Sequence, residues 1–580
     1  MRKDINIIEK SRKFNKAIFT FQWLITIVFG GLLVYLFGLQ VCDMKHYKTR
    51  LIRQRQAASR IMRGTIVDRN GIKMASDKMR YEVYAHPSEY KNSSPKHTTQ
   101  ELAEMLSDLL KIPVPELKKT LDNARHITTL KKDVDKETAV KIKKLGLFDI
   151  SVDAVPYRNY PQGIMAAHVL GYYNINDGLA MGVEETANAD LAYVEDTTSL
   201  EKTPSGDVIF GIGTDPDKIT KPAIGKTVKL TIDSAIQHIC EVELTKMVTS
   251  KHASKGAVVV MNPKNGEILG YAVYPTYDPN NYHKYSYENL KNWTLSDVIT
   301  PGSTFKTLTV ASAMERGKVN KYSKINDTGK MKLGEWTIEN YDYHSKGAPG
   351  LISLEYLLEH SSNVASAKVA LMMGAQEFYD QLLKFGIGRK TGIDLPGESA
   401  GIFKSPDKWD GSQQGSMGYG YSMGTTVIQM ISAVSAIANG GVKVTPHVIM
   451  YTPEELEKHV TSEQVISPET AKIMTEIMTE SVDNSKGAAK VEGYSVAAKT
   501  GTSRKPNENG RGYSNKLYTS IIGYLPSYDP QLLIYVVVDS ASGGEVWGST
   551  VAAPVFREVA AQSARIMGIA PNRPIKNKVR

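Results

Sequence analysis

The sequence predicts a multidomain α+β protein with three parts: a transmembrane helix, an elongated α+β region, and a domain in which helices cover both faces of an antiparallel sheet. Three observations support this class. The 580 residues are too many for a single core, since domains usually contain about 100 to 200 residues. One long apolar run lies near the N-terminus, and strand-length apolar runs gather at both ends of the C-terminal half.

The composition excludes several classes of protein. A hydrophobic fraction of 41% and a charged fraction of 23% are typical of folded chains. The net charge of +10 would suit nucleic acid, but no zinc-finger spacing or aromatic RNA-binding motif accompanies it, so nucleic acid is not an expected partner. Cys42 and Cys240 are the two cysteines, which excludes a disulfide framework; we expect no metal and no other cofactor.

Residues 17–41 form the predicted transmembrane helix. The run from Ala17 to Cys42 has no charged residue and exceeds the roughly 20 residues that a helix needs to cross a bilayer. No small-x-small cleavage site follows it, so we expect it to remain as a single anchor. Six basic residues precede it, and the positive-inside rule therefore places residues 1–16 in the cytoplasm and the chain after about residue 43 outside.

Residues 42–220 are predicted to form an α+β scaffold, called the pedestal below. Asp68–Gly71 has the composition of a tight turn between two short apolar runs. Helical patterns follow near residues 102–110 and 137–145. His168 has no acidic or cysteine neighbour at ligand spacing, so we expect a structural role for it. The pedestal thus contains no catalytic grouping of its own.

A second folded unit is predicted at residues 221–570, followed by a basic tail at 571–580. It begins with a strand and an amphipathic helix over residues 225–248. Asn265-Gly266 then joins two apolar runs, which is a strong hairpin signal. Residues 518–540 predict another hairpin, and a closing helix follows over 549–567. Strands at both ends of a helix-rich middle favour an antiparallel sheet covered by helices on both faces.

The first chemical motif is Ser303-Thr304-Phe305-Lys306. Pro301-Gly302 precedes a helical run, which places Ser303 at a helix start and Lys306 on the same face. A serine hydroxyl needs a base to become a nucleophile, and a lysine of lowered pKa can act as that base. The same S-x-x-K pattern at residues 93–96 and 199–202 lacks this context. Lys306 is therefore the candidate base.

Two further motifs follow in order, Ser361-Ser362-Asn363 and Lys499-Thr500-Gly501-Thr502. Another Lys-Thr-Gly at residues 390–392 lies in a glycine- and proline-rich stretch that is typical of a loop. Lys499 instead ends an apolar run, as expected for an inner strand beside a cleft. Gly501 would let a substrate backbone approach closely. The ordered set of three motifs, and not any one of them, carries the prediction.

This ordered set is the signature of serine β-lactamases and penicillin-binding proteins. The chain resembles the penicillin-binding transpeptidases over nearly its whole length, and within them the monofunctional class B enzymes. The stretches that carry this resemblance include RGTIVDRNG, RNYPQG, LTIDSAIQ, TGIDLPGE and AAPVF. LTID, AAPVF and the lack of added C-terminal modules are most similar to the septal cell-division branch.

The resemblance implies a peptidoglycan D,D-transpeptidase with a pedestal that is dimerisation-like and a penicillin-binding, β-lactamase-like fold at residues 221–570. Ser303 would attack a D-Ala-D-Ala carbonyl while Lys306 accepts its proton. Ser361 would pass a proton to the leaving D-alanine, and Asn363 would hold Lys306 and the substrate amide.

The resemblance also assigns roles to the third motif. Lys499 would add positive charge near Lys306, and Thr500 and Thr502 would bind the peptide carboxylate beside Gly501. The backbone N–H groups of Ser303 and Thr502 would form the oxyanion hole. The implied partners are donor and acceptor stem peptides, β-lactam antibiotics, a polytopic membrane glycan polymerase, and other division or elongation proteins. The implied location is the bacterial cell membrane, with the catalytic domain outside the cytoplasm.

Two stretches depart from the family pattern. Ile299-Thr300 stands where the family usually has Tyr-Glu, and residues 418–430 replace the usual G-x-G-x-x-x-T-P. An elongation transpeptidase of the lateral wall and a catalytically weak scaffold subunit therefore stay open as alternatives. A β-lactamase seldom needs a membrane span with a pedestal, a β-lactam sensor would have several spans, and a bifunctional glycosyltransferase would need a larger N-terminal domain.

Overall fold

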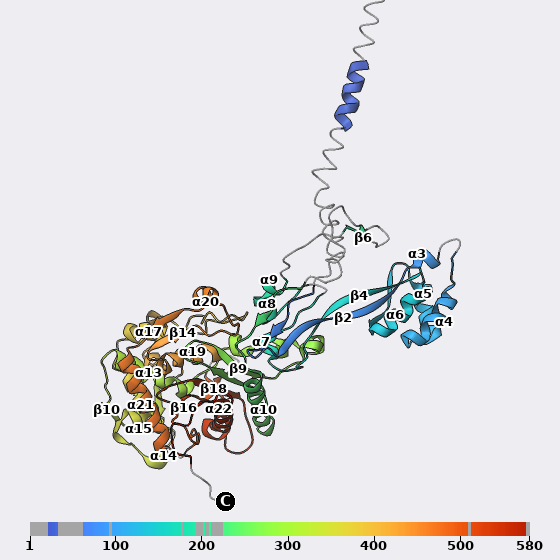
Figure 1. Cartoon of the computed structure of the whole chain (residues 1–580). Coiled ribbons are helices and arrows are strands. Elements are labelled where there is room, and N and C mark those ends of the chain that lie inside the picture. The colour runs from blue at the N-terminus through green and yellow to red at the C-terminus, as the bar shows by residue number, and fades with distance from the viewer. Residues whose placement is uncertain are drawn as a thin grey trace, which may run out of the picture. The chain divides into compact units, whose positions relative to one another are not determined.

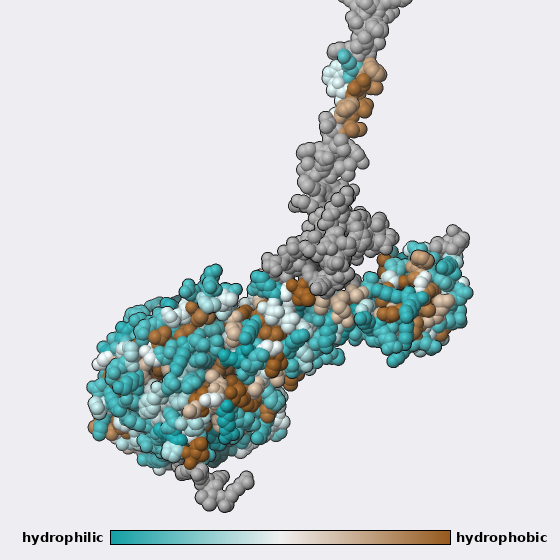
Figure 2. All heavy atoms as spheres, in the orientation of Figure 1, coloured by the Kyte–Doolittle hydropathy of each residue, from teal (hydrophilic) through white to brown (hydrophobic). Residues whose placement is uncertain are grey.

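The structure, a computed structural model, describes residues 21–32, 62–91, 95–175, 178–192, 201–202, 208–209, 224–485, 487–507 and 512–575 (Figure 1). Residues 21–32 form a helix whose apolar side chains are exposed (Figure 2). Within the described ranges, no helix has the combined length and apolarity that crossing a membrane requires. Residues 1–20 and 33–41, which include the predicted tail and the rest of the predicted span, lie outside the described residues.

A five-stranded sheet forms the centre of the described pedestal. Gly71 has a φ of 88° and its N–H donates to the carbonyl of Asp68, so the turn predicted at Asp68–Gly71 is confirmed. β2 pairs antiparallel with β1, β3 and β4, and β1 pairs in parallel with β7. The strands are β1 (Ile66–Val67), β2 (Lys73–Ala85), β3 (Thr128–Val134), β4 (Ile150–Asn159) and β7 (Val228–Lys229). A separate pair consists of β5 (Glu201–Lys202) and β6 (Val208–Ile209).

The two helices predicted in the pedestal are confirmed as α4 (Thr99–Leu110) and α6 (Lys136–Lys144). α4 begins at a capping box between Thr98 and Glu101, which satisfies two free backbone donors. The buried faces of these helices join one cluster with β2 and β4. The other short helices are α3 (Pro87–Tyr90), α5 (Val114–Asn123), α7 (Ala167–Leu170), α8 (Val183–Thr186) and α9 (Asn188–Leu191).

The C-terminal region is built on an antiparallel sheet with the strand order β16-β17-β18-β8-β9. The hairpin predicted at Asn265-Gly266 joins β8 to β9, and the hairpin predicted over residues 518–540 is formed by β17 and β18. Both predictions are confirmed. The strands are β8 (Lys255–Met261), β9 (Ile268–Tyr274), β16 (Ala497–Pro506), β17 (Tyr513–Leu525) and β18 (Leu532–Asp539).

Helices cover both faces of this sheet, as predicted. On one face, α10 (Ser234–Ser250) and α22 (Ala553–Ile566) bury Leu244 and Phe556 in a cluster with Val536 of β18. On the other face, α13 (Lys306–Glu315), α19 (Val427–Ala438) and α21 (Pro468–Asn484) bury Leu308 and others in a cluster with Tyr535. Full burial of one such side chain contributes about 1.5–3 kcal/mol. α13, which begins at Lys306, is thereby fixed on the sheet.

The middle of this region contains short helices and three two-stranded sheets. The sheets pair β10 (Lys324–Asp327) with β13 (Gly350–Ser353), β11 (Lys330–Leu333) with β12 (Trp336–Glu339), and β14 (Val442–Val444) with β15 (Ser462–Gln464). The helices are η3 (Pro279–Lys284), α11 (Tyr287–Leu290), α12 (Trp293–Ser296), η4 (Gly302–Phe305), α14 (Tyr343–Lys346), α15 (Leu354–Glu359), α16 (Asn363–Leu371), α17 (Ala375–Lys384), η5 (Pro406–Lys408), α18 (Gln413–Met417) and α20 (Pro453–His459). After the last strand, η6 (Gly548–Ala552) leads directly into α22.

The strand predicted at the start of the second unit has an unexpected partner. It is β7, and it pairs with β1 in the pedestal sheet and not with the strands of the C-terminal sheet. The helix predicted to follow it is α10, whose N-terminus is capped by Asp233. Residue 221, the predicted domain boundary, lies outside the described residues, so the boundary itself stays a prediction.

Candidate active site

Ser303 lies where a tight turn leads into α13. It occupies the single 3-10 turn η4, and Lys306 is the first residue of α13, which confirms the helix start predicted from Pro301-Gly302. Gly302 has a φ of 56°, and a Cβ there would lie 2.7 Å from the Cβ of Ser503 on β16. Glycine therefore allows the Ser303 turn to pack directly against the strand.

Lys306 is fully buried, and its ammonium group meets the second motif. Nζ donates to the carbonyl of Ser361 at 2.5 Å, to Ser361 Oγ at 3.1 Å and to Asn363 Oδ1 at 2.8 Å. Burial lowers the pKa of Lys306 well below its usual value, the charge of Lys499 lowers the pKa further, and the charge of Asp327 raises it. The amine can therefore lose its proton at a lower pH than an exposed lysine.

Ser361–Asn363 forms a turn that leads into α16. Ser361 has a φ of 54°, in the left-handed region that residues other than glycine seldom adopt. Ser362 Oγ accepts from the N–H of Ala365 at 2.9 Å and caps the helix. Asn363 Nδ2 donates to the carbonyl of Glu339 at 3.0 Å, which turns its Oδ1 toward Lys306. Backbone strain of this kind costs about 1–3 kcal/mol and is characteristic of functional sites.

Lys499–Thr502 lies on β16, which packs against the Ser303 turn. β16 is the edge strand of the sheet, so the prediction of an inner strand is wrong; the apolar run before Lys499 is explained by burial of both faces. Burial lowers the pKa of Lys499 to about 7, and its Nζ donates to the carbonyl of Thr500 at 2.9 Å. An edge strand leaves backbone groups free to pair with an extended peptide.

Gly501 was expected to let a substrate backbone approach closely, but in the structure its neighbours are side chains of the protein. A Cβ there would lie 2.5 Å from Oγ of Ser520 and 3.0 Å from Cγ2 of Thr304, so the close approach is made by the protein's own side chains. Its contact with substrate stays a prediction. Beside it, the Oγ1 of Thr502 accepts from the N–H of Gly548 at 3.0 Å. The structure thus brings all three motifs together at the junction of η4, α16 and β16.

Two family profiles match the chain: the penicillin-binding protein dimerisation domain at residues 59–216 and the penicillin binding protein transpeptidase domain at residues 256–561. The transpeptidase match alone covers more than half of the sequence. The chain belongs to the penicillin-binding protein transpeptidases. Because it combines the dimerisation and transpeptidase domains, it is a class B penicillin-binding protein and a serine-type peptidoglycan D,D-transpeptidase of cell-wall synthesis. Stem peptides are the substrates, and β-lactams the ligands, that this family implies.

Individual relatives match over most of the chain. Stage V sporulation protein D of Bacillus subtilis is 33% identical, with 88% of this chain and 79% of that protein covered. Peptidoglycan D,D-transpeptidase FtsI of Escherichia coli K12 is 29% identical, with 91% and 87% covered. A solved structure of a peptidoglycan synthetase from Bifidobacterium adolescentis has the same fold, with a TM-score of 0.66 and 24% identity over 89% of this chain and 97% of that one.

The two departures from the penicillin-binding family pattern meet in the structure. Ile299 is buried and exchanges backbone hydrogen bonds of 2.8 and 3.0 Å with Thr425, which belongs to the 418–430 stretch. The carbonyl of Thr300 accepts from Ser503 Oγ at 2.6 Å. Ile299 and Thr300 make these contacts through their backbone groups. The side chains that depart from the family pattern therefore do not break the hydrogen bonds that hold the Ser303 turn.

Sequence reasoning missed two residues behind the Ser361–Asn363 turn. Asp327 is fully buried and accepts from Ser362 Oγ at 2.5 Å and from Asn340 Nδ2 at 2.8 and 3.0 Å. Asn340 Oδ1 in turn accepts from the N–H of Asn363 at 2.9 Å. In the sequence, Asp327 precedes Thr-Gly and resembles an ordinary turn residue. Only the fold brings it to the motif.

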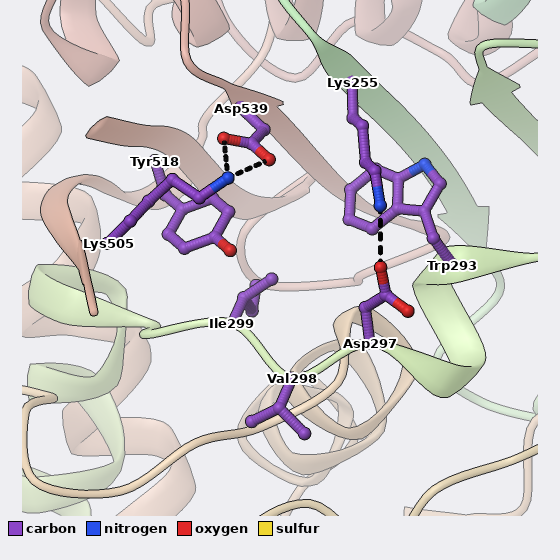
Figure 3. A pocket seen from close by; sticks show the side chains of 8 residues that line it. All are labelled: Lys255, Trp293, Asp297, Val298, Ile299, Lys505, Tyr518 and Asp539. Atoms are coloured by element: carbon purple, nitrogen blue, oxygen red, sulfur yellow. Dashed lines mark hydrogen bonds and ion pairs between the residues drawn. The ribbon is translucent and has the colours of Figure 1, made fainter. Parts of the chain in front are cut away.

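A cavity of about 320 Å³ lies beside the residues that lead to the Ser303 turn. Lys255 pairs with Asp297 at 2.7 Å, and Lys505 pairs with Asp539 at 2.6 Å. Figure 3 shows these pairs on opposite sides of the cavity, with Ile299 between them. The other lining residues are Trp293, Val298 and Tyr518. None of the predicted site residues lines this cavity, so it is separate from the three motifs.

Two residues that the sequence set aside make structural contacts. His168 is buried, its Nε2 lies 2.9 Å from the carbonyl of Asn289, and burial lowers its pKa to about 4, as expected for a structural histidine. Thr391 of the second Lys-Thr-Gly lies in a loop and is held by hydrogen bonds to Glu398. Both expectations are confirmed.

Proposed function

We propose that Ser303 is the residue acylated during cross-linking and that Lys306 is its general base. The observation that supports this assignment is the full burial of Lys306 against the Ser361–Asn363 turn, with a second lysine nearby to lower its pKa. A buried lysine of lowered pKa can hold a free amine, which is the form that accepts a proton. None of the hydrogen bonds described for Lys306 goes to Ser303; such contacts commonly tighten only when substrate is bound.

The reaction that the family resemblance implies uses these residues in turn. Ser303 Oγ attacks the carbonyl carbon between the two terminal D-alanines, and its proton passes to Lys306. The resulting oxyanion is held by the backbone N–H groups of Ser303 and Thr502, and loss of such a donor slows catalysis by about 10²–10³. The C–N bond then breaks, and the D-alanine amine leaves with a proton that Ser361 relays. An amine of a second stem peptide takes the acyl group and frees Ser303.

The remaining site residues bind the donor peptide. Asn363 holds Lys306 and the substrate amide, while Lys499, Thr500 and Thr502 receive the terminal carboxylate. The edge position of β16 supports this role, because its free backbone groups suit an extended peptide chain beside Gly501. A cationic Lys499 would both attract the carboxylate and favour the neutral form of Lys306.

The test of this chemistry uses the full-length chain in detergent, a synthetic stem pentapeptide ending in D-Ala-D-Ala, and an amine acceptor. Release of D-alanine together with an amide product, both lost in Ser303→Ala, is the expected result. Ser199→Ala, in one of the other S-x-x-K matches, should behave as the parent. Product formation that persists in Ser303→Ala would refute the assignment, and release of D-alanine without amide product would identify a carboxypeptidase instead.

Residues 17–41 anchor the enzyme as a single pass in the bacterial cell membrane, with residues 1–16 inside. The support is the uncharged run between basic residues and the rest of the chain. Membranes that carry the full-length chain should retain it in alkaline carbonate, whereas a chain that begins at residue 43 should be released. Release of the full-length chain would contradict the anchor.

The enzyme acts at the division septum, beside a polytopic glycan polymerase that supplies nascent strands. The support is sequence similarity of Leu230–Asp233 and Ala552–Phe556 to the septal branch. Depletion in the host bacterium should block septation and leave cells that continue to elongate. Rounded cells that still divide would instead identify an elongation enzyme of the lateral wall.

A further inference from the structure

A buried carboxylate lies directly behind the turn that faces Lys306. Asp327 ends β10 and has no exposed surface. Besides Ser362 and Asn340, the N–H of Gly329 donates to its Oδ1 at 2.8 Å. The pairing of β10 with β13 fixes its backbone, since Asp327 lies opposite Gly350. An ionised group is expensive to bury unless its acceptors are satisfied, so this carboxylate is held in one place by a built network.

Two short hydrogen-bonded paths connect Asp327 to the base. In the first path, Ser362 Oγ donates to Asp327. Ser362 is bonded through the backbone to Ser361, whose carbonyl accepts from Lys306. The other runs through Asn340, which accepts from the N–H of Asn363, the second acceptor of Lys306. Movement of the carboxylate would therefore move both acceptors that meet the lysine.

The charge of Asp327 has no cationic partner in this network. Every hydrogen bond described for it comes from a neutral donor: a backbone N–H, an amide and a hydroxyl. Two charged groups act on Lys306, Lys499 from β16 and Asp327 from β10, whereas the acceptors on the Ser361–Asn363 turn are neutral. The negative charge of Asp327 raises the pKa of Lys306 and so opposes Lys499.

We propose that Asp327 is a positioning residue for the general base: through Ser362 and Asn340 it holds the Ser361–Asn363 turn against Lys306. Its negative charge acts on the same lysine, whose pKa it raises. The inference rests on the proposed role of Lys306. Burial and Lys499 both favour the free amine, but a lysine with too low a pKa is a weak base. Asp327 restores part of the basicity while remaining out of contact with substrate.

The test is the pH dependence of acylation by a fluorescent penicillin, measured on the full-length chain in detergent. Asp327→Asn removes the charge and keeps the shape of the side chain. Without the negative charge Lys306 loses its proton more readily, so the acidic limb of the rate profile should move to lower pH. The plateau should fall about tenfold or more, because the base is weaker and its acceptors are less well held.

Two matched variants separate charge from position. Ser362→Ala keeps the charge of Asp327 but removes one of its hydrogen bonds and the cap of α16, so acylation should slow at every pH while the acidic limb stays in place. Asp394→Asn alters another buried carboxylate, which accepts from the N–H groups of Val448 and Ile449 at 2.7 and 2.8 Å. It controls for the general effect of losing a buried carboxylate, and its acidic limb should match the parent.

The outcomes distinguish this inference from the proposed function. An acidic limb that stays in place in Asp327→Asn, or that moves to higher pH, would overturn the role of the charge. If Asp327→Asn does not fold, Ser362→Ala decides the positioning role: a parental acylation rate would overturn it. Normal acylation in Lys306→Ala would instead remove the base assignment on which the inference rests.

Discussion

Replacing Lys306 by alanine should abolish nearly all acylation while leaving the fold intact. General-base catalysis contributes about 10²–10⁴ in rate, equivalent to about 2.7–5.5 kcal/mol of barrier. The change removes the donor to Ser361 and Asn363 but also removes a buried amine that is poorly solvated. These effects oppose one another, so we expect the free energy of unfolding to change by no more than about 2 kcal/mol.

The assay is the rate of labelling of the full-length chain by a fluorescent penicillin, with thermal unfolding measured in parallel. Lys384→Ala is a matched control, because this lysine is exposed at the end of α17 and its ammonium group makes none of the contacts described for Lys306. It should acylate as the parent does. A Lys306→Ala chain that is folded and acylates at the parental rate would refute the reasoning about the base.

Two further predictions concern β16. The acylation rate should rise with pH as Lys306 loses its proton, and fall above about pH 7, where Lys499, whose pKa burial lowers to about 7, loses the charge that binds the carboxylate. Rate profiles from pH 5 to 10 test this, and a rate that stays constant above pH 7 would contradict it. Gly501→Ala should slow acylation and lower the melting temperature, because its methyl group would lie 2.5 Å from Ser520 Oγ and 3.0 Å from Thr304 Cγ2. Adding Ser520→Ala should restore part of the acylation rate and part of the melting temperature. If Gly501→Ala alone changes neither quantity, β16 can shift to make room for the methyl group and the prediction is wrong.

Local sequence signals predicted much of the fold. The Asn265-Gly266 turn, the helical pattern near residues 102–110 and the Pro301-Gly302 start of the Ser303 turn act over a few residues, and the structure has each of them. The alternation of strand-rich ends and a helix-rich middle was enough to predict an antiparallel sheet with two covered faces. The three motifs could be found from their order alone, because their residue types are fixed by the chemistry.

Contacts between distant segments could not be predicted in this way. The strand near residue 228 has a strand-like composition, but nothing in it indicates that its partner is β1 in the pedestal. β16 has the apolar run of an inner strand although it is an edge strand, because helices and the Ser303 turn bury its faces. Asp327 is 35 residues from Ser362 in the sequence, and only the path of β10 brings them into contact.

The most direct test of Ser303 as the nucleophile is mass spectrometry of the full-length chain after incubation with a penicillin, alongside Ser303→Ala. We expect one stable acyl adduct, located on the peptide that contains Ser303, and no adduct in the variant. An adduct on another residue, or none in the parent, would contradict the central claim that Ser303 is the acylated nucleophile. Rapid loss of the Ser303 adduct would identify a β-lactamase activity in place of transpeptidation.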